Sequence, residues 1–138
     1  MQATPPAQDE TTDRSPVRDD ELLWRRILRE QLKWSEDEQR WKISDGAFKD
    51  TRLSVYRAAL TTVEWVMREA KPASNLGELS AQLIRSCGCL IEPDYVPGEP
   101  GHAEIAPPPT IQGRYIPGKC AKLMARVARL LLPLPEPN

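Results

Sequence analysis

Three polar residues on two predicted strands have the chemistry of a proton-transfer site. His102 and Glu104 stand two positions apart, so both side chains point to one face of a strand over 102–106. A carboxylate beside an imidazole sets the tautomer of the ring and raises its pKa for acid–base work. Arg57, on a second predicted strand, joins them if the two strands are neighbours. The grouping suits group transfer from a nucleotide or dinucleotide, although a lone histidine after Pro-Gly is more typical of a surface or capping residue.

The same histidine and the three cysteines of the chain are the ligand types of a tetrahedral zinc site, namely Cys87, Cys89, His102 and Cys120. The spacing is unfavourable, since one residue separates Cys87 from Cys89 where a zinc knuckle has two to four. Cys120 falls on the apolar side of a predicted helix, where a small hydrophobe is expected. We therefore predict no metal and no cofactor, with Cys89 in the core. Three cysteines are too few for a disulfide scaffold, which fits a reducing compartment.

Residues 113–120, GRYIPGKC, have the Gly-x-x-x-x-Gly-Lys spacing of a phosphate-binding loop ahead of a helix. Cys120 stands where a hydroxyl would bind magnesium. The 18 residues after it leave no room for the later strands and the acidic metal ligand of a nucleotidase. The pattern therefore predicts only a helix that opens at Pro117-Gly118.

That last helix carries a basic stripe opposite an apolar one. The cations are Lys119, Lys122, Arg126 and Arg129. They suit an acidic protein partner, nucleic-acid phosphate or an anionic membrane surface, and a solvated face is the alternative that needs no partner.

Two tryptophans, Trp34 and Trp41, bracket a charged connector. Tryptophan is enriched among the anchors of protein interfaces, so the pair suits an exposed aromatic contact site. The alternative is that both rings fill the core.

The strands and helices expected from the sequence together predict an α+β domain, in which a small antiparallel or mixed sheet packs against about three helices. Strands are expected near 41–48, 53–60, 89–92 and 102–106. A helix over 20–33 would place Leu23, Ile27 and Trp34 on one face, with an extended segment over 22–27 as the alternative. Further helices are predicted over 61–70, from a Thr-x-x-Glu capping box at Thr61, and from Asn75 to Gly88.

Both ends of the chain differ in composition from the middle. Residues 1–18 have no Leu, Ile or aromatic side chain, which predicts a disordered acidic arm. The domain then spans 19–132, and a Pro-rich tail follows over 133–138. Residues 1–21 have a net charge of −4 and residues 110–138 of +4, whereas the whole chain has −1. No membrane span or secretion signal is evident, so we expect a cytoplasmic protein that does not coat nucleic acid nonspecifically.

Four segments together resemble a family of small uncharacterised bacterial proteins. They are ELLWRRI, the Ser-x-x-x-Phe segment in WKISDGAFKD, the Leu-Ser-Val-x-Arg-Ala strand in LSVYRAALTT, and the Pro-x-His-Ala-x-Ile strand in EPGHAEI. The resemblance covers roughly residues 21–132. It implies an extended WRRI segment at the start of the domain and implies no activity.

The function that the sequence favours is a non-catalytic accessory or interaction module with a protein partner, because none of the candidate groups has the convergence that an enzyme site requires. A small group-transfer enzyme acting through His102, Glu104 and Arg57 is the alternative. Nucleic-acid binding through the basic helix is a second alternative.

Overall fold

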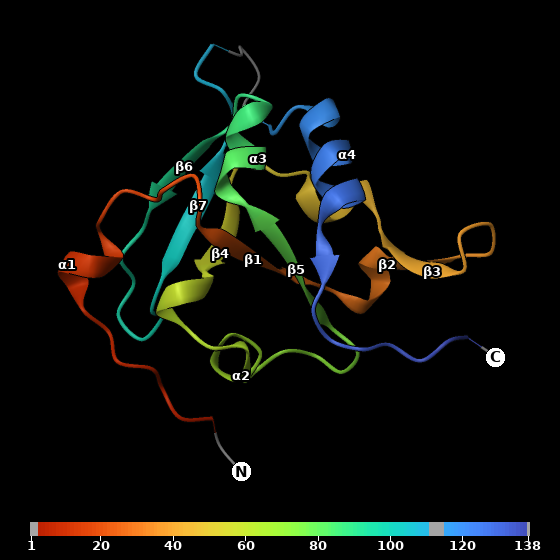
Figure 1. Ribbon diagram of the computed structural model, residues 1–138, viewed down its shortest axis with the longest axis horizontal. Helices are drawn as coiled ribbons and strands as arrows, with labels where there is room; N and C mark the ends of the chain where they lie inside the picture. The colour runs from red at the N-terminus through yellow and green to blue at the C-terminus, as the bar shows by residue number, and fades with distance from the viewer. Residues whose placement is uncertain (1–2, 111–114, 138) are drawn as a thin grey trace.

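The computed structural model describes residues 3–110 and 115–137, and its fold is α+β. Six antiparallel strands form the main sheet in the order β6-β7-β4-β1-β5-β8, and β2 and β3 form a separate hairpin (Figure 1). The strands are β1 Leu22–Ile27, β2 Leu32–Ser35, β3 Arg40–Ile43, β4 Leu53–Arg57, β5 Asn75–Ser80, β6 Leu90–Pro93, β7 His102–Ala106 and β8 Arg129–Leu130. The helices are α1 Glu10–Asp13, α2 Val63–Val66, α3 Ala81–Ser86 and α4 Gly118–Val127, with 3₁₀ turns η1 Arg29–Gln31, η2 Asp45–Phe48 and η3 Ala58–Leu60.

The main core lies on one face of the sheet, where alternate strand residues point inward. Leu23, Val55 and Ile105 are fully buried there, together with Phe48 of η2 and Met124 of α4. Helix α4 packs against η2 and β3, and α3 packs against β5 and β6. The opposite face carries a smaller core of Trp24, Tyr56, Val66 and Leu76, which α2 helps to cover.

The segment expected as a helix over 20–33 is instead β1, η1 and β2. Strand β1 pairs along its whole length with β5, from Leu22 opposite Ser80 to Ile27 opposite Asn75. Leu23 and Ile27 stand four apart, a spacing that one helical face and one strand face share. The helix prediction was therefore wrong, and the extended alternative over 22–27 is confirmed.

The helix expected from Asn75 begins only at Ala81. Residues 75–80 are β5, and the Ser80 hydroxyl accepts a hydrogen bond from the Leu83 N–H as the N-cap of α3. The Asn75 side chain binds Leu132 rather than a first helical turn. Leucines occur at a similar spacing in a buried strand and in a helix, so the sequence did not reveal the boundary between β5 and α3.

The two other predicted helices are shorter than expected. The N-cap of α2 is Thr62, not Thr61, and its hydroxyl accepts from the Trp65 N–H at 3.1 Å. Helix α2 ends at Val66 instead of near residue 70. Helix α4 ends at Val127, and the chain then pairs with β5 as β8, because Ala128 adopts an extended backbone.

Residues 3–18, expected to belong to a disordered arm, lie against the domain and include α1. Asp13 and Val17 are buried, and the Asp13 carboxylate accepts a hydrogen bond from the backbone N–H of Gly101. Polar contacts and the single buried side chain of Val17 hold this segment, so its low content of apolar residues did not reveal the packing. None of the helices in the described ranges has the length and apolar character needed to cross a membrane.

Candidate binding site

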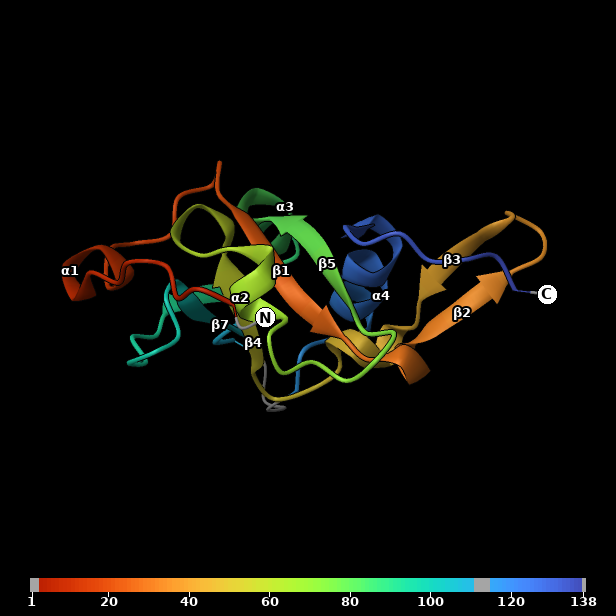
Figure 2. The same cartoon turned by 90° about the horizontal axis from the view of Figure 1, so that it is seen from below.

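A pocket of about 450 Å³ opens between the β2–β3 hairpin and the junction of α4 with β8. We call it the hairpin–helix pocket. Its lining residues are Arg40, Trp41, Lys42, Ile43 and the six consecutive residues Ala125 to Leu130. The hairpin lies at the end of the molecule opposite α1 (Figure 2).

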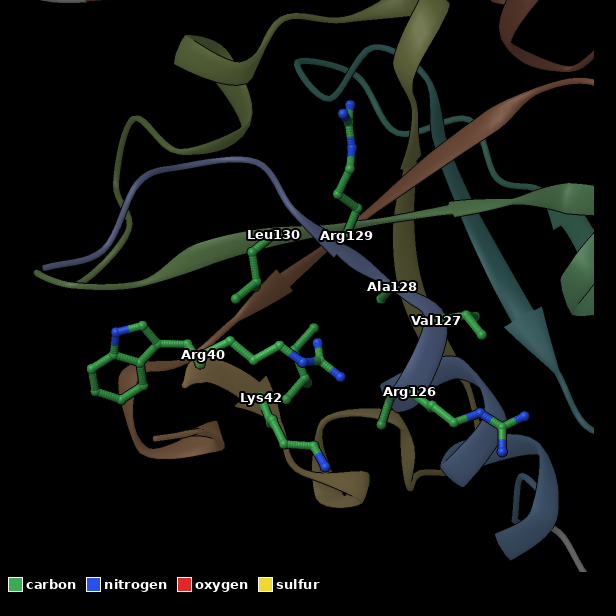
Figure 3. Close-up of a pocket in the computed structure, with 10 residues that line it drawn as sticks. Arg40, Lys42, Arg126, Val127, Ala128, Arg129 and Leu130 are labelled. Carbon is green, nitrogen blue, oxygen red and sulfur yellow. The ribbon is translucent and has the colours of Figure 1, made fainter. Parts of the chain in front are cut away.

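Four cations line this pocket, two from β3 and two from the α4–β8 junction. Figure 3 shows the Arg40 side chain reaching across from β3 toward this junction. The side chains of Arg126 and Arg129 point away from β3 and in different directions from each other. Cations that diverge in this way are suited to charges spaced along an extended anion rather than to one compact anion.

The hairpin adds a further cation next to the pocket. Lys33 on β2 lies directly opposite Lys42 on β3, and a second pocket, of about 440 Å³, includes both side chains in its lining. Like charges directly opposite each other destabilise a strand pair. Arg40 and Lys42 both bind Glu38, at 3.0 and 2.5 Å, so one carboxylate serves two cations and Lys33 adds a third. This face of the hairpin therefore has a net positive charge that an anionic ligand would relieve.

The cations of the α4–β8 side differ in their pairing. Arg129 binds Glu78 at 3.1 Å, and Glu78 also accepts a hydrogen bond from the Trp24 indole. Among the described residues, no carboxylate lies within 4.0 Å of the Arg126 guanidinium. Arg126 is therefore the cation of the pocket most available to a ligand.

An aromatic pair borders the pocket on the other face of the hairpin. Trp34 and Trp41 meet edge to face with ring centroids 5.7 Å apart, and the Arg29 guanidinium lies 4.9 Å from the Trp41 ring. The Trp41 indole donates a hydrogen bond to the carbonyl of Pro135 in the tail. Trp41 is half-buried, so one tryptophan contacts both the pocket and the Pro-rich tail.

The predicted partner-binding residues are thus brought together only in part. Trp41, Arg126 and Arg129 line the hairpin–helix pocket, and Trp34 packs on Trp41. Lys119 and Lys122 are exposed on α4 and are not among the residues that line this pocket.

The three predicted catalytic side chains do not converge. The His102 and Tyr56 rings meet edge to face with centroids 5.4 Å apart, and the His102 Nδ1 atom lies 3.1 Å from an Asp94 carboxylate oxygen. Glu104 binds Arg52 at 3.2 Å. Arg57 is buried and binds Glu21, so each of the three side chains has a different partner. The strands β4 and β7 are neighbours, as the grouping required, but the strand alternation places Arg57 on the opposite face of the sheet from Tyr56.

The three cysteines, in contrast, do come together. Their sulfur atoms all lie within 4.8 Å of one another, whereas His102 is not part of the group. Cys89 and Cys120 are buried, as expected for Cys89, and Cys87 is half-buried. Burial, followed by the neighbouring thiols, raises the pKa of Cys89, and burial raises the pKa of Cys120 to about 11. Burial therefore disfavours the thiolate form of Cys89 and of Cys120.

The phosphate-loop pattern lies partly outside the described residues. Its helix does begin at Gly118, after Pro117, as predicted.

No known protein family, curated protein or solved structure matches this chain. The resemblance to a family of small bacterial proteins remains a prediction.

Lys33, Arg40 and Lys42 were not among the predicted site residues. Their signal was present in the hairpin, where basic residues alternate with Trp34, Trp41 and Ile43 as on a two-faced strand. The charged connector between the tryptophans hid this alternation.

Proposed function

We propose that this protein is a non-catalytic interaction module that binds an acidic segment of a protein partner in the hairpin–helix pocket. One observation carries the proposal: Arg40 and Lys42, from β3, line the same pocket as Arg126 and Arg129, more than eighty residues later in the chain. Cations from distant segments that share a pocket form one surface of positive potential, which attracts an anionic partner and orients it.

The apolar share of the lining favours a protein ligand over a nucleic acid. Ile43, Val127, Leu130 and Trp41 are among the residues that line the pocket. An apolar centre with arginines at its rim is typical of protein interfaces, whereas nucleic-acid interfaces are more polar and more strongly basic.

The separation of His102, Glu104 and Arg57 supports a non-catalytic role. Groups that act together in catalysis must face one site, within hydrogen-bond reach of the proton that they transfer. These three side chains instead have separate partners: Glu104 binds Arg52, Arg57 binds Glu21, and His102 lies beside Asp94.

Fluorescence anisotropy with two labelled probes tests the proposal. One probe is a short peptide of Asp and Glu with two leucines, and the other is a single-stranded oligonucleotide of equal charge. We expect tighter binding of the peptide, and a loss of about tenfold or more in the Arg40→Glu/Arg126→Glu variant, because two attractive charges become repulsive. The matched control is Arg14→Glu, which reverses an exposed charge at the other end of the molecule (Figure 1) and should leave the affinity unchanged.

Two results would contradict the proposal. Equal affinity for the peptide in the double variant and in Arg14→Glu would remove the hairpin–helix pocket as the site. Tighter binding of the oligonucleotide, with a steep loss of affinity on adding salt, would support the nucleic-acid alternative instead.

A further inference from the structure

The three cysteines of the chain meet although they come from two separate segments. Cys87 ends α3, Cys89 precedes β6, and Cys120 lies in the first turn of α4. The Sγ atoms of Cys87 and Cys89 are 3.9 Å apart, and the Cys120 thiol donates a hydrogen bond to the Cys87 carbonyl at 3.1 Å. The last contact fixes α4 against the Cys87–Cys89 turn, so the group is part of the tertiary structure and not a local motif.

Gly88 is the residue that allows Cys87 and Cys89 to face the same point. Its φ of +93° lies in the left-handed region, which a residue with a side chain rarely adopts. The backbone therefore turns sharply between the two cysteines. In an extended strand, the Cα atoms of residues two positions apart would be about 6.6 Å from each other. A side chain at Gly88 would also meet Pro108 at 3.3 Å.

The distances match those around a thiolate-bound metal ion. A metal–sulfur bond of about 2.3 Å places the sulfur atoms about 4.0 Å apart in a planar three-coordinate site and about 3.8 Å apart in a tetrahedral one. The three sulfur atoms lie within 4.8 Å of one another, so they need to move only slightly closer together to bind such an ion. No further His, Cys, Asp or Glu in the described ranges belongs to the group, so the protein supplies three soft ligands.

We propose that Cys87, Cys89 and Cys120 form a three-sulfur site for a soft metal ion of the Cu(I) type. Three soft thiolates select such ions, whereas a structural zinc site has four protein ligands. Binding replaces three S–H bonds by three S–Cu bonds and releases three protons, with no change in oxidation state. Half-buried Cys87 gives the ion access from solvent.

The test is a titration of the fully reduced protein with Cu(I), without oxygen, in competition with a chromogenic Cu(I) chelator. We expect one ion per chain, and X-ray absorption should show three sulfur atoms around the copper. Cys120→Ser keeps the neighbouring pair Cys87 and Cys89, so it separates the folded site from a local two-thiol motif. We expect it to weaken binding at least about tenfold, since the loss of a group that merely orients a ligand already costs that much.

Ser86→Ala, beside Cys87, is the matched control and should bind copper as the wild type does. If Cys120→Ser fails to fold, as judged by circular dichroism, the X-ray absorption of the wild type decides. Copper bound by two sulfurs, or with the same affinity in Cys120→Ser, would overturn the proposal. The site is distant in sequence from Arg40 and Lys42, and its test is independent of the one for the acidic peptide.

Discussion

Arg57 and Glu21 form a buried ion pair with two parallel hydrogen bonds. The Nε and Nη2 atoms of Arg57 donate to the two carboxylate oxygens of Glu21, each at 2.8 Å. The remaining donors of the guanidinium bind carbonyls of the N-terminal segment, including that of Ser15 at 2.8 Å. Arg57 therefore attaches residues 3–18 to β4, and a residue that we considered for catalysis is a structural anchor.

Glu21→Gln should lower the free energy of unfolding by roughly 3–5 kcal/mol, because it leaves the Arg57 charge buried without its partner. Urea denaturation measures this change. The loosened N-terminal segment should also be cut faster by trypsin after Arg14 and Arg18. The control is Glu10→Gln, which removes an exposed ion pair with Arg14 and should cost less than about 1 kcal/mol. Equal stability of the two variants would contradict the anchor role.

The same pair should make the stability depend on acid pH. Burial by itself raises the pKa of Glu21, but hydrogen bonds from Arg57 and from the Arg18 N–H, with the charge of Arg57, outweigh it and lower the pKa. A lowered pKa in the folded state gives stability that is complete above the unfolded pKa and is lost as the pH falls through the folded one. Urea midpoints of the wild type should therefore fall below about pH 4.5, and those of Glu21→Gln should fall less steeply.

Gly101→Ala should be more destabilising than Gly98→Ala. Both glycines have a positive φ, so both substitutions strain the backbone by about 1–2 kcal/mol. A side chain at Gly101 would also lie 3.0 Å from the Arg57 carbonyl and from Leu60, whereas nothing lies within 4 Å at Gly98. Urea denaturation of the two variants isolates the effect of this close approach. A smaller loss for Gly101→Ala than for Gly98→Ala would refute it.

Asn75→Ala should detach the C-terminal tail from β5. The buried Asn75 side chain donates to the Leu132 carbonyl at 2.9 Å and accepts from the Leu132 N–H at 3.0 Å. Leaving these groups without a partner costs about 1–3 kcal/mol. Because the Trp41 indole binds Pro135 in this tail, its N–H resonance should shift in NMR spectra. The Trp65 indole, which binds Gly98, is the internal control and should not move.

Alkylation by iodoacetamide should distinguish the three thiols. Cys87 is the one cysteine that is partly exposed to solvent, so it should react first in the metal-free protein at neutral pH. Cys120, with a pKa raised to about 11, should react at a comparable rate only after unfolding in urea. Mass spectrometry of the peptides gives the order. Rapid labelling of Cys120 in the folded protein would contradict its burial.

The α+β class and the strands β6 and β7 could be predicted from the sequence, because alternation and turn residues are local signals. Strand β1 could not be predicted with certainty, since the spacing of Leu23 and Ile27 fits a helix and a strand equally well. Its pairing with β5, which is fifty residues away, decides between the two. The packing of the N-terminal segment was also missed, because it is held mainly by polar contacts with Arg57 and by only one buried apolar side chain, that of Val17.

The sequence by itself determined which residue types were available: a basic last helix, Trp34 and Trp41 on either side of a charged connector, three cysteines and one histidine. Only the tertiary structure decided which of them meet. It brought Arg126 and Arg40 to the lining of one pocket, gathered the three sulfurs without His102, and gave His102, Glu104 and Arg57 separate partners. The physical reason is that each of these contacts joins segments far apart in the chain, and such contacts depend on strand pairing and burial across the whole domain rather than on local spacing.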